Sequence, residues 1–94
     1  MIVFATSITA PVAYRRHAEP GIRLAAEADS EVWAFSAAGS IFRSYNLLLD
    51  KAAARDDVEA LVLVHQDAEL VDPDFCRKAR RALNWLVCTK KRRF

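Results

Sequence analysis

The stretch Ala60-Leu61-Val62-Leu63-Val64-His65-Gln66-Asp67 passes from five apolar residues directly to three polar ones. A short, continuous apolar run is typical of a strand covered on both faces, as in a parallel sheet. Two further runs of this kind, at residues 2–8 and 32–36, precede it, and segments with helical spacing lie between and after the three runs. The pattern predicts a small three-layer α/β domain in the order β-α-β-α-β-α with a parallel sheet. Leu63 is expected to be buried, so Leu63→Ala should cost roughly 2–5 kcal/mol.

The chain has 94 residues, which is room for one small domain. Hydrophobic residues make up 53% of it and charged residues 28%, a composition that excludes a disordered chain. No apolar run approaches the roughly 18 residues of a membrane span, and no basic residue precedes the apolar start, as it would in a signal peptide. We therefore expect a soluble, cytoplasmic domain. The two cysteines, Cys76 and Cys88, stand 12 residues apart in one predicted helix and are expected to be reduced thiols.

The first predicted helix follows the strand at 2–8. Thr9 is expected to cap it, and Pro11 is tolerated in its first turn. Pro20-Gly21 is expected to break this helix, because proline and glycine interrupt the helical hydrogen-bond pattern. A second helical piece would then run over residues 22–28.

The other two predicted helices follow Gly39 and Val71. Ser40 is expected to cap the first of them. Its apolar stripe toward the sheet, at spacings of 4, 3 and 4, consists of Ile41, Tyr45, Leu48 and Ala52. Asp72 is expected to cap the last helix, with Pro73 at its first position. The buried stripe of that helix is expected to consist of Phe75, Ala79, Ala82, Leu83 and Leu86.

Polar residues follow the predicted strands where each strand ends. In an open parallel sheet, ligands bind beyond the carboxyl ends of the strands, and the third strand is followed there by residues 65–69. Asp67 and Glu69 are two residues apart, so in an extended segment both carboxylates would face the same side. Two oxygen ligands of this kind suit Mg²⁺ or Mn²⁺ holding a diphosphate. The alternative, that these are ordinary polar residues where a strand leaves the core, stays open.

The sequence lacks the motifs of several common phosphate-binding and catalytic sites. Neither of the glycine-rich phosphate-binding patterns, GxGxxG and GxxxxGK[ST], occurs. No GxSxG elbow supports a hydrolase. His17 lies among charged residues of a predicted surface helix, and the sequence assigns it no role.

Charge is distributed unevenly along the chain. Residues 1–69 carry 6 Lys and Arg against 10 Asp and Glu, a balance of −4, whereas residues 70–94 carry 8 against 2, a balance of +6. A basic end can meet nucleic acid, phosphate or a membrane surface, or it can be a solvated helix face. The segment Lys90-Lys91-Arg92-Arg93 has no interleaved aromatic residues or glycines, which makes nucleic-acid binding the weaker interpretation.

A resemblance to a known family is carried by two segments: Arg43-Ser44-Tyr45-Asn46-Leu47-Leu48-Leu49-Asp50-Lys51-Ala52 and Leu61-Val62-Leu63-Val64-His65-Gln66-Asp67. The chain resembles the nucleotide-sugar-binding half of GT-A-fold, Rossmann-like glycosyltransferases, in the family-2-like group and the subgroup related to the streptomycin-biosynthesis protein StrF. There, a helix bearing an asparagine leads into an apolar strand that ends in an acidic motif. In the broad family this motif is Asp-x-Asp, which holds the metal and the sugar nucleotide, and in the subgroup a His-Gln-Asp form looks usual. Asp72-Pro73-Asp74-Phe75 resembles the segment that opens the next helix.

The resemblance covers roughly residues 1–87, followed by a basic tail at 88–94. It implies a sheet order of 2-1-3. The substrate-binding residues that it implies are Thr6 and Ser7 near the base, Arg43 and Asn46 toward the sugar nucleotide, and His65, Gln66 and Asp67 in the acidic motif. His65 stands in place of the first acid of the family motif. Asp67, with Glu69 added for its spacing, is the candidate ligand set for Mn²⁺ or Mg²⁺.

Glycosyltransferases of this fold have a second half, which binds the acceptor and usually supplies the general base. That half would follow residue 87, where the sequence continues into the basic tail and ends. We therefore expect a truncated, transferase-like domain that binds a nucleoside-diphosphate sugar and is incomplete for hexosyl transfer on its own. Two alternatives stay open. One is an assembly module in which sheet edges pair between copies of the chain, and the other is a nucleic-acid binder that uses the basic tail.

Overall fold

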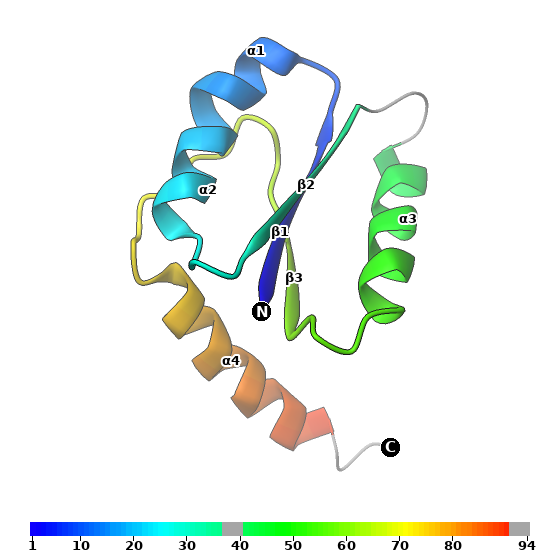
Figure 1. Ribbon diagram of the computed structural model, residues 1–94, viewed down its shortest axis with the longest axis vertical. Helices are drawn as coiled ribbons and strands as arrows, with labels where there is room; N and C mark the ends of the chain where they lie inside the picture. Colours follow the sequence, from blue (N-terminus) through cyan, green and yellow to red (C-terminus); the bar gives the residue numbers. More distant parts are fainter. Residues whose placement is uncertain (37–40, 91–94) are drawn as a thin grey trace.

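The computed structural model describes residues 1–36 and 41–90 of the chain. Its centre is a parallel sheet of three strands, β1 (Ile2–Ile8), β2 (Glu31–Ser36) and β3 (Ala60–Leu63). The strands lie in the order β2-β1-β3, and both neighbours are parallel to β1 (Figure 1). This confirms the predicted α/β class and the predicted order of strands.

Helices cover both faces of the sheet. Three consecutive segments form one helical rod on one face: α1 (Pro11–Ala13), η1 (Tyr14–Ala18) and α2 (Glu19–Ala25). The first turns of α4 (Phe75–Lys90) pack on the same face, and α3 (Ile41–Ala53) packs on the opposite one (Figure 1). The three layers follow from right-handed β-α-β crossovers.

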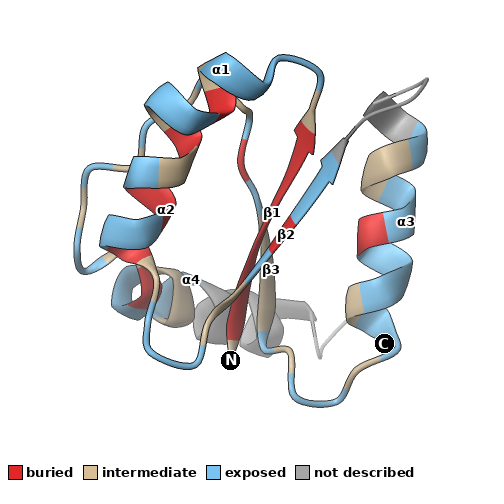
Figure 2. Cartoon of the chain, turned by 45° about the horizontal axis from the view of Figure 1, so that its top comes forward, coloured by how far each residue is buried: buried red, intermediate tan, exposed pale blue. Residues whose placement is uncertain are grey.

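The central position of β1 in the sheet explains why the sequence of this strand is continuously apolar. Ile2 and Phe4 belong to the core cluster under the helical rod, whereas Val3 and Ala5 belong to the cluster under α3. Alternate side chains of a strand point to opposite faces, and here both faces are covered, so β1 is buried along its length (Figure 2). Among the helical residues, Ile22 and Leu48 are fully buried against these two faces.

The outer strand β3 is less buried than the sequence predicted. Leu63 is 39% exposed, although the apolar run predicted a buried strand. Its outer side has no neighbouring strand in the sheet. Only Val64, just past the strand, is buried at 3% exposure. We therefore expect Leu63→Ala to cost less than the roughly 2–5 kcal/mol of a buried leucine.

The first helix also differs from expectation. It runs through Pro20-Gly21 without a break, because the turn before Pro20 is a π-helix. The N–H of Glu19 donates to the carbonyl of Tyr14, five residues back, which widens the helix where proline would otherwise clash with the preceding turn. The cap residue is Ala10 rather than Thr9, and no side chain of the helix itself caps it.

The last helix begins two residues later than predicted. The carboxylate Oδ1 of Asp72 accepts a hydrogen bond of 2.9 Å from the N–H of Asp74, and the helix starts at Phe75. Phe75 packs on the core as predicted, but Ala82 is exposed. Cys76 is a free thiol, as expected; it was not part of the predicted stripe, but it is buried, and its Sγ donates to the carbonyl of Ala25. The predicted cap Ser40, and the side chains of Ile41, Leu83, Leu86 and Cys88, lie outside what the structure describes.

No helix within residues 1–36 and 41–90 combines the length and the hydropathy that crossing a membrane requires.

Candidate functional site

The candidate site lies at the carboxyl ends of the parallel strands, here called the carboxyl edge of the sheet. Strands β1 and β2 both end there, α3 begins there, and the chain leaves β3 through the segment 64–71 (Figure 1). This segment runs back beside the helical rod before α4 begins. Most of the residues singled out in the sequence lie in this segment or at the ends of these elements.

Thr6 and Ser7 lie inside the molecule rather than on a binding surface. Their exposed fractions are 0% and 6%. Because consecutive residues of a strand face opposite sides, Thr6 lies on the face of the helical rod and Ser7 on the face of α3. Neither hydroxyl has a hydrogen-bond partner within the described part of the chain. Buried hydroxyls without a hydrogen-bond partner are uncommon. The expected contact of Thr6 and Ser7 with the nucleotide base stays a prediction.

The segment after β3 is folded into a turn. The N–H of Val64 still donates to the carbonyl of Ala5 at 2.8 Å, but the N–H of Ala68 donates to the carbonyl of His65 at 2.9 Å. The chain is therefore not extended over residues 65–68. The geometric argument that placed Asp67 and Glu69 on one side, which assumed an extended strand, does not apply.

His65 and Asp67 form a pair at the surface. The Nδ1 of His65 donates to the Oδ1 of Asp67, and both side chains are more than half exposed. Among the described residues, the second nitrogen of His65 and the second oxygen of Asp67 have no partner. Two of the three residues of the acidic motif are thus held together by the turn.

Glu69 faces a different element. Its Oε1 lies 2.7 Å from the Nδ1 of His17, in the π-helical turn of the rod. The pair lines an open pocket of about 200 Å³ whose walls are Arg16, His17, Pro20, Gly21, Leu24, Glu69, Leu70 and Val71. Sequence reasoning gave His17 no role, and no local signal could have found it, because its partner is 52 residues away in the chain.

Gln66, in the same turn, contacts the two residues before α1. Its Oε1 accepts hydrogen bonds of 2.9 Å from the N–H groups of both Thr9 and Ala10. Its Nε2 donates to the Oγ1 of Thr9, also at 2.9 Å. These are the backbone groups at the start of α1, which has no cap of its own.

Arg43 and Asn46 are exposed on α3, one turn apart on the same helix. They belong to the layer on the other face of the sheet from the helical rod that Gln66 and Glu69 contact. Their expected contact with a sugar nucleotide stays a prediction.

A metal ion would depend mainly on Asp67. Within residues 1–36 and 41–82, whose side chains are described apart from 36, 41 and 42, no three His, Cys, Asp or Glu side chains gather closely enough to hold one. Mg²⁺, however, is often held by one or two carboxylates together with substrate phosphates and water. Asp67 fits that arrangement through its second oxygen. Glu69 also has one oxygen paired with a histidine, but that histidine is His17, so Glu69 faces the helical rod rather than the turn that holds Asp67.

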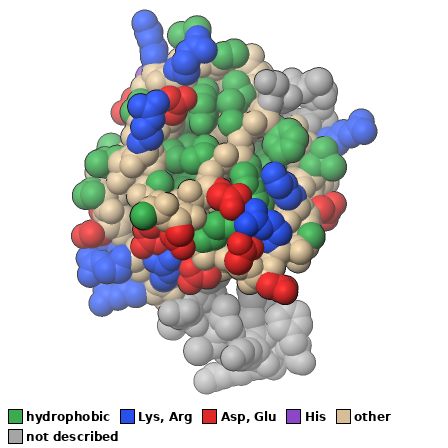
Figure 3. Space-filling view, in the orientation of Figure 1, with side chains coloured by type: hydrophobic (Ala, Val, Ile, Leu, Met, Phe, Trp, Pro, Cys, Tyr) green, Lys and Arg blue, Asp and Glu red, His purple; other side chains and the backbone are tan. Residues whose placement is uncertain are grey.

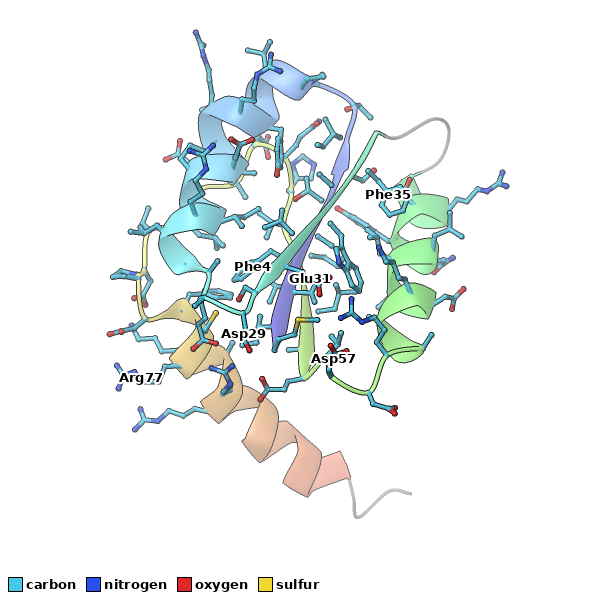
Figure 4. The ribbon with its side chains drawn as sticks, in the orientation of Figure 1. Phe4, Asp29, Glu31, Phe35, Asp57 and Arg77 are labelled. Carbon is cyan, nitrogen blue, oxygen red and sulfur yellow. The ribbon has the colours of Figure 1, made fainter. Side chains whose placement is uncertain are left out.

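The opposite end of the sheet, where the strands begin, carries two ion-pair networks. Arg55 bonds to both Glu31 and Asp57 (Figure 4), and Arg80 bonds to Glu27 and Glu59. Figure 3 shows acidic and basic side chains interspersed in the lower part of this view. The Arg80 guanidinium, and after it the amino group of Met1, lower the pKa of Glu59 from 4.5 to about 2. These networks join residues at the beginnings of the strands, at the far end of the sheet from the carboxyl edge.

Comparisons with known proteins give one informative similarity. No family model matches the chain, and no solved structure is significantly similar to it. The chain is 33% identical over 70 residues to the streptomycin biosynthesis protein StrF of Streptomyces griseus. The matched stretch is 74% of this chain but 25% of StrF, so the chain spans about a quarter of the length of that relative. The chain is thus a distant relative of one part of a streptomycin biosynthesis protein.

Proposed function

We propose that the chain is a glycosyltransferase-type domain that binds a nucleoside-diphosphate sugar at the carboxyl edge of its sheet. The observation that carries the proposal is the turn after β3, which places His65 and Asp67 together at the surface. The similarity to a biosynthetic protein supports it. So does the parallel α/β sheet, a fold that commonly binds ligands at this edge.

The proposed contacts follow from the chemistry of a diphosphate. A Mn²⁺ or Mg²⁺ ion, held by Asp67, would neutralise part of the phosphate charge. In this proposal, the second ring nitrogen of His65 contacts a phosphate or sugar oxygen. Arg43, exposed near the start of α3, offers a guanidinium, which pairs well with phosphate groups.

The proposed role is binding rather than transfer by this stretch alone. Sugar transfer also needs an acceptor site and a group that takes a proton from the acceptor. The similarity to StrF spans a quarter of that protein. The resemblance to glycosyltransferases implies that a separate half would bind the acceptor.

An assembly role is the second candidate. Apolar side chains are exposed on both outer strands of the sheet: Val32 at 47%, Phe35 at 37% and Leu63 at 39%. Outer strands of this kind can pair with another chain. Nucleic-acid binding by the basic tail stays a prediction, because residues 91–94 are outside those that the structure describes.

Thermal denaturation of the chain with UDP, GDP and TDP, each with and without Mn²⁺, tests the proposal. A ligand at a hundred times its dissociation constant adds about 2.7 kcal/mol of stability, which corresponds to roughly 10–20 °C in a domain of this size. We expect one nucleotide to raise the melting temperature, and more so with Mn²⁺. Uridine and inorganic phosphate are the controls. The absence of any shift at millimolar nucleotide would contradict the proposal.

A further inference from the structure

Gln66 occupies the middle of the motif that the sequence assigned to substrate, yet its side chain is bound within the protein. Its amide makes three hydrogen bonds of 2.9 Å, two from the N–H groups of Thr9 and Ala10 and one to the Oγ1 of Thr9. Thr9 and Ala10 directly precede α1, with Ala10 as its N-cap, so their N–H groups have no partner within the helix and need one from elsewhere. The side chain of Ala10 has no polar atom that could cap the helix.

The segment that contains Gln66 is attached to the helical rod at further points. Glu69 meets His17 in the π-helical turn. Leu70 lies directly against Gly21, so closely that a Cβ on the glycine would come within 2.5 Å of the Leu70 nitrogen. Figure 1 shows the segment, coloured yellow-green to yellow, running beside the rod. The side chains of His65 and Asp67 remain exposed on this anchored segment.

We propose that Gln66 is a positioning residue: it caps the helix at Thr9–Ala10 from a distant part of the chain and thereby fixes the turn that presents His65 and Asp67. It does not contact the ligand. This inference deepens the proposed function and rests on it for the role of His65 and Asp67. The capping itself can be tested without any ligand.

Two substitutions separate positioning from ligand contact. Gln66→Glu keeps an oxygen that accepts from both N–H groups, and the hydroxyl of Thr9 can donate to the second oxygen. A negative charge is also favourable at a helix N-terminus. Gln66→Ala removes all three hydrogen bonds. If Gln66 touched a diphosphate, however, the added charge of Gln66→Glu would repel it.

The experiment measures amide hydrogen exchange at Thr9 and Ala10, amide chemical shifts at His65 and Asp67, and binding of UDP, GDP and TDP with Mn²⁺. In Gln66→Ala we expect faster exchange at Thr9 and Ala10, shifted resonances at His65 and Asp67, and nucleotide binding weakened at least tenfold. In Gln66→Glu we expect native-like exchange and shifts, and a dissociation constant within about threefold of the parent. The matched control is Gln66→Met, which keeps the length of the side chain without the amide and should behave like Gln66→Ala.

The outcomes distinguish the two proposals. A folded Gln66→Glu variant with native exchange that no longer binds nucleotide would overturn the positioning role in favour of direct contact. Unchanged exchange at Thr9 and Ala10 in Gln66→Ala would overturn the capping role. Failure of the parent chain to bind any nucleotide would remove the proposed function, while the exchange data would still decide whether Gln66 fixes the turn.

Discussion

Gly21 lies against the backbone of Leu70. A Cβ added to Gly21 would come within 2.5 Å of the nitrogen and 2.7 Å of the carbonyl oxygen of Leu70. Glycine inside a helix normally costs about 1 kcal/mol relative to alanine, so its presence in α2 needs a reason. The close contact supplies it, because only a residue without a side chain lets the segment after β3 approach the helix.

Gly21→Ala should therefore destabilise the protein, although helix propensity alone predicts a gain. The clash is with backbone atoms, which cannot rotate away, and overpacking of this kind typically costs about 1–3 kcal/mol. The measurement is the free energy of unfolding in urea. Arg23→Ala, at an exposed position of the same helix, is the control and should change it by no more than about 0.5 kcal/mol. A more stable Gly21→Ala variant would show that the segment does not rest on the helix.

The two leucines Leu48 and Leu63 should respond differently to truncation. Leu48 is fully buried between α3 and the sheet, whereas Leu63 is 39% exposed at the edge. Leu48→Ala should cost about 2–5 kcal/mol, since it leaves a cavity, and Leu63→Ala clearly less. Chemical denaturation of both variants measures the difference. Equal losses would mean that another surface covers Leu63 in solution.

Acid should weaken the protein through Glu59. Its pKa is lowered from 4.5 to about 2, so its pairing with Arg80 contributes stability above pH 4.5 that is lost as the pH falls toward 2. The pKa values of Glu27, Glu31, Asp57 and Asp72 are lowered too, and their contributions fall in the same direction.

The melting temperature of Glu59→Gln, followed from pH 6 to pH 2, checks this assignment. The variant should start lower than the parent at pH 6 and lose less on acidification, because one of the titrating pairs is gone. Curves that stay parallel across this range would exclude Glu59 as a contributor.

Asp67→Asn should abolish the part of nucleotide binding that depends on Mn²⁺ and leave the fold intact. The carboxylate of Asp67 is exposed and contributes little packing, so its loss should not unfold the domain. Glu69→Gln is the matched control: Glu69 is engaged with His17, and its variant should keep the effect of Mn²⁺. Isothermal titration of both variants with and without Mn²⁺ gives the comparison. If Glu69→Gln lost the effect of Mn²⁺ and Asp67→Asn kept it, the metal ligand would be Glu69 instead.

Self-association should depend on the apolar side chains of the outer strand β2. Val32 and Phe35 are exposed there, and charged residues on an outer strand prevent pairing with other chains. In sedimentation at increasing concentration, we expect the parent chain to form larger species and the Val32→Lys variant to remain smaller. A parent chain that stays monomeric over a wide concentration range would remove the assembly role.

The α/β class, the strands and part of the core could be predicted from the sequence alone. The runs at 2–8, 32–36 and 60–64 predicted three strands, and strands form there. The central strand is covered on both faces, whereas the two outer strands carry exposed apolar residues. The apolar stripe of α3 likewise placed Leu48 in the core. Each of these features follows from residues close together in the chain, where the spacing of apolar side chains is visible directly.

The different roles of the residues after β3 could not be predicted, because they depend on contacts with distant parts of the chain. Gln66 caps α1 through Ala10 and Thr9, which directly precede the helix and lie 56 and 57 positions before Gln66, and Glu69 pairs with His17 over 52 positions. The unbroken rod through Pro20 and the exposure of Leu63 depend in the same way on a widened turn and on an outer strand without a neighbour. Hydrogen bonds and packing between distant segments form only once the chain is folded. For that reason the spacing of Asp67 and Glu69 suggested one site, and the folded chain turns their carboxylates toward two different histidines.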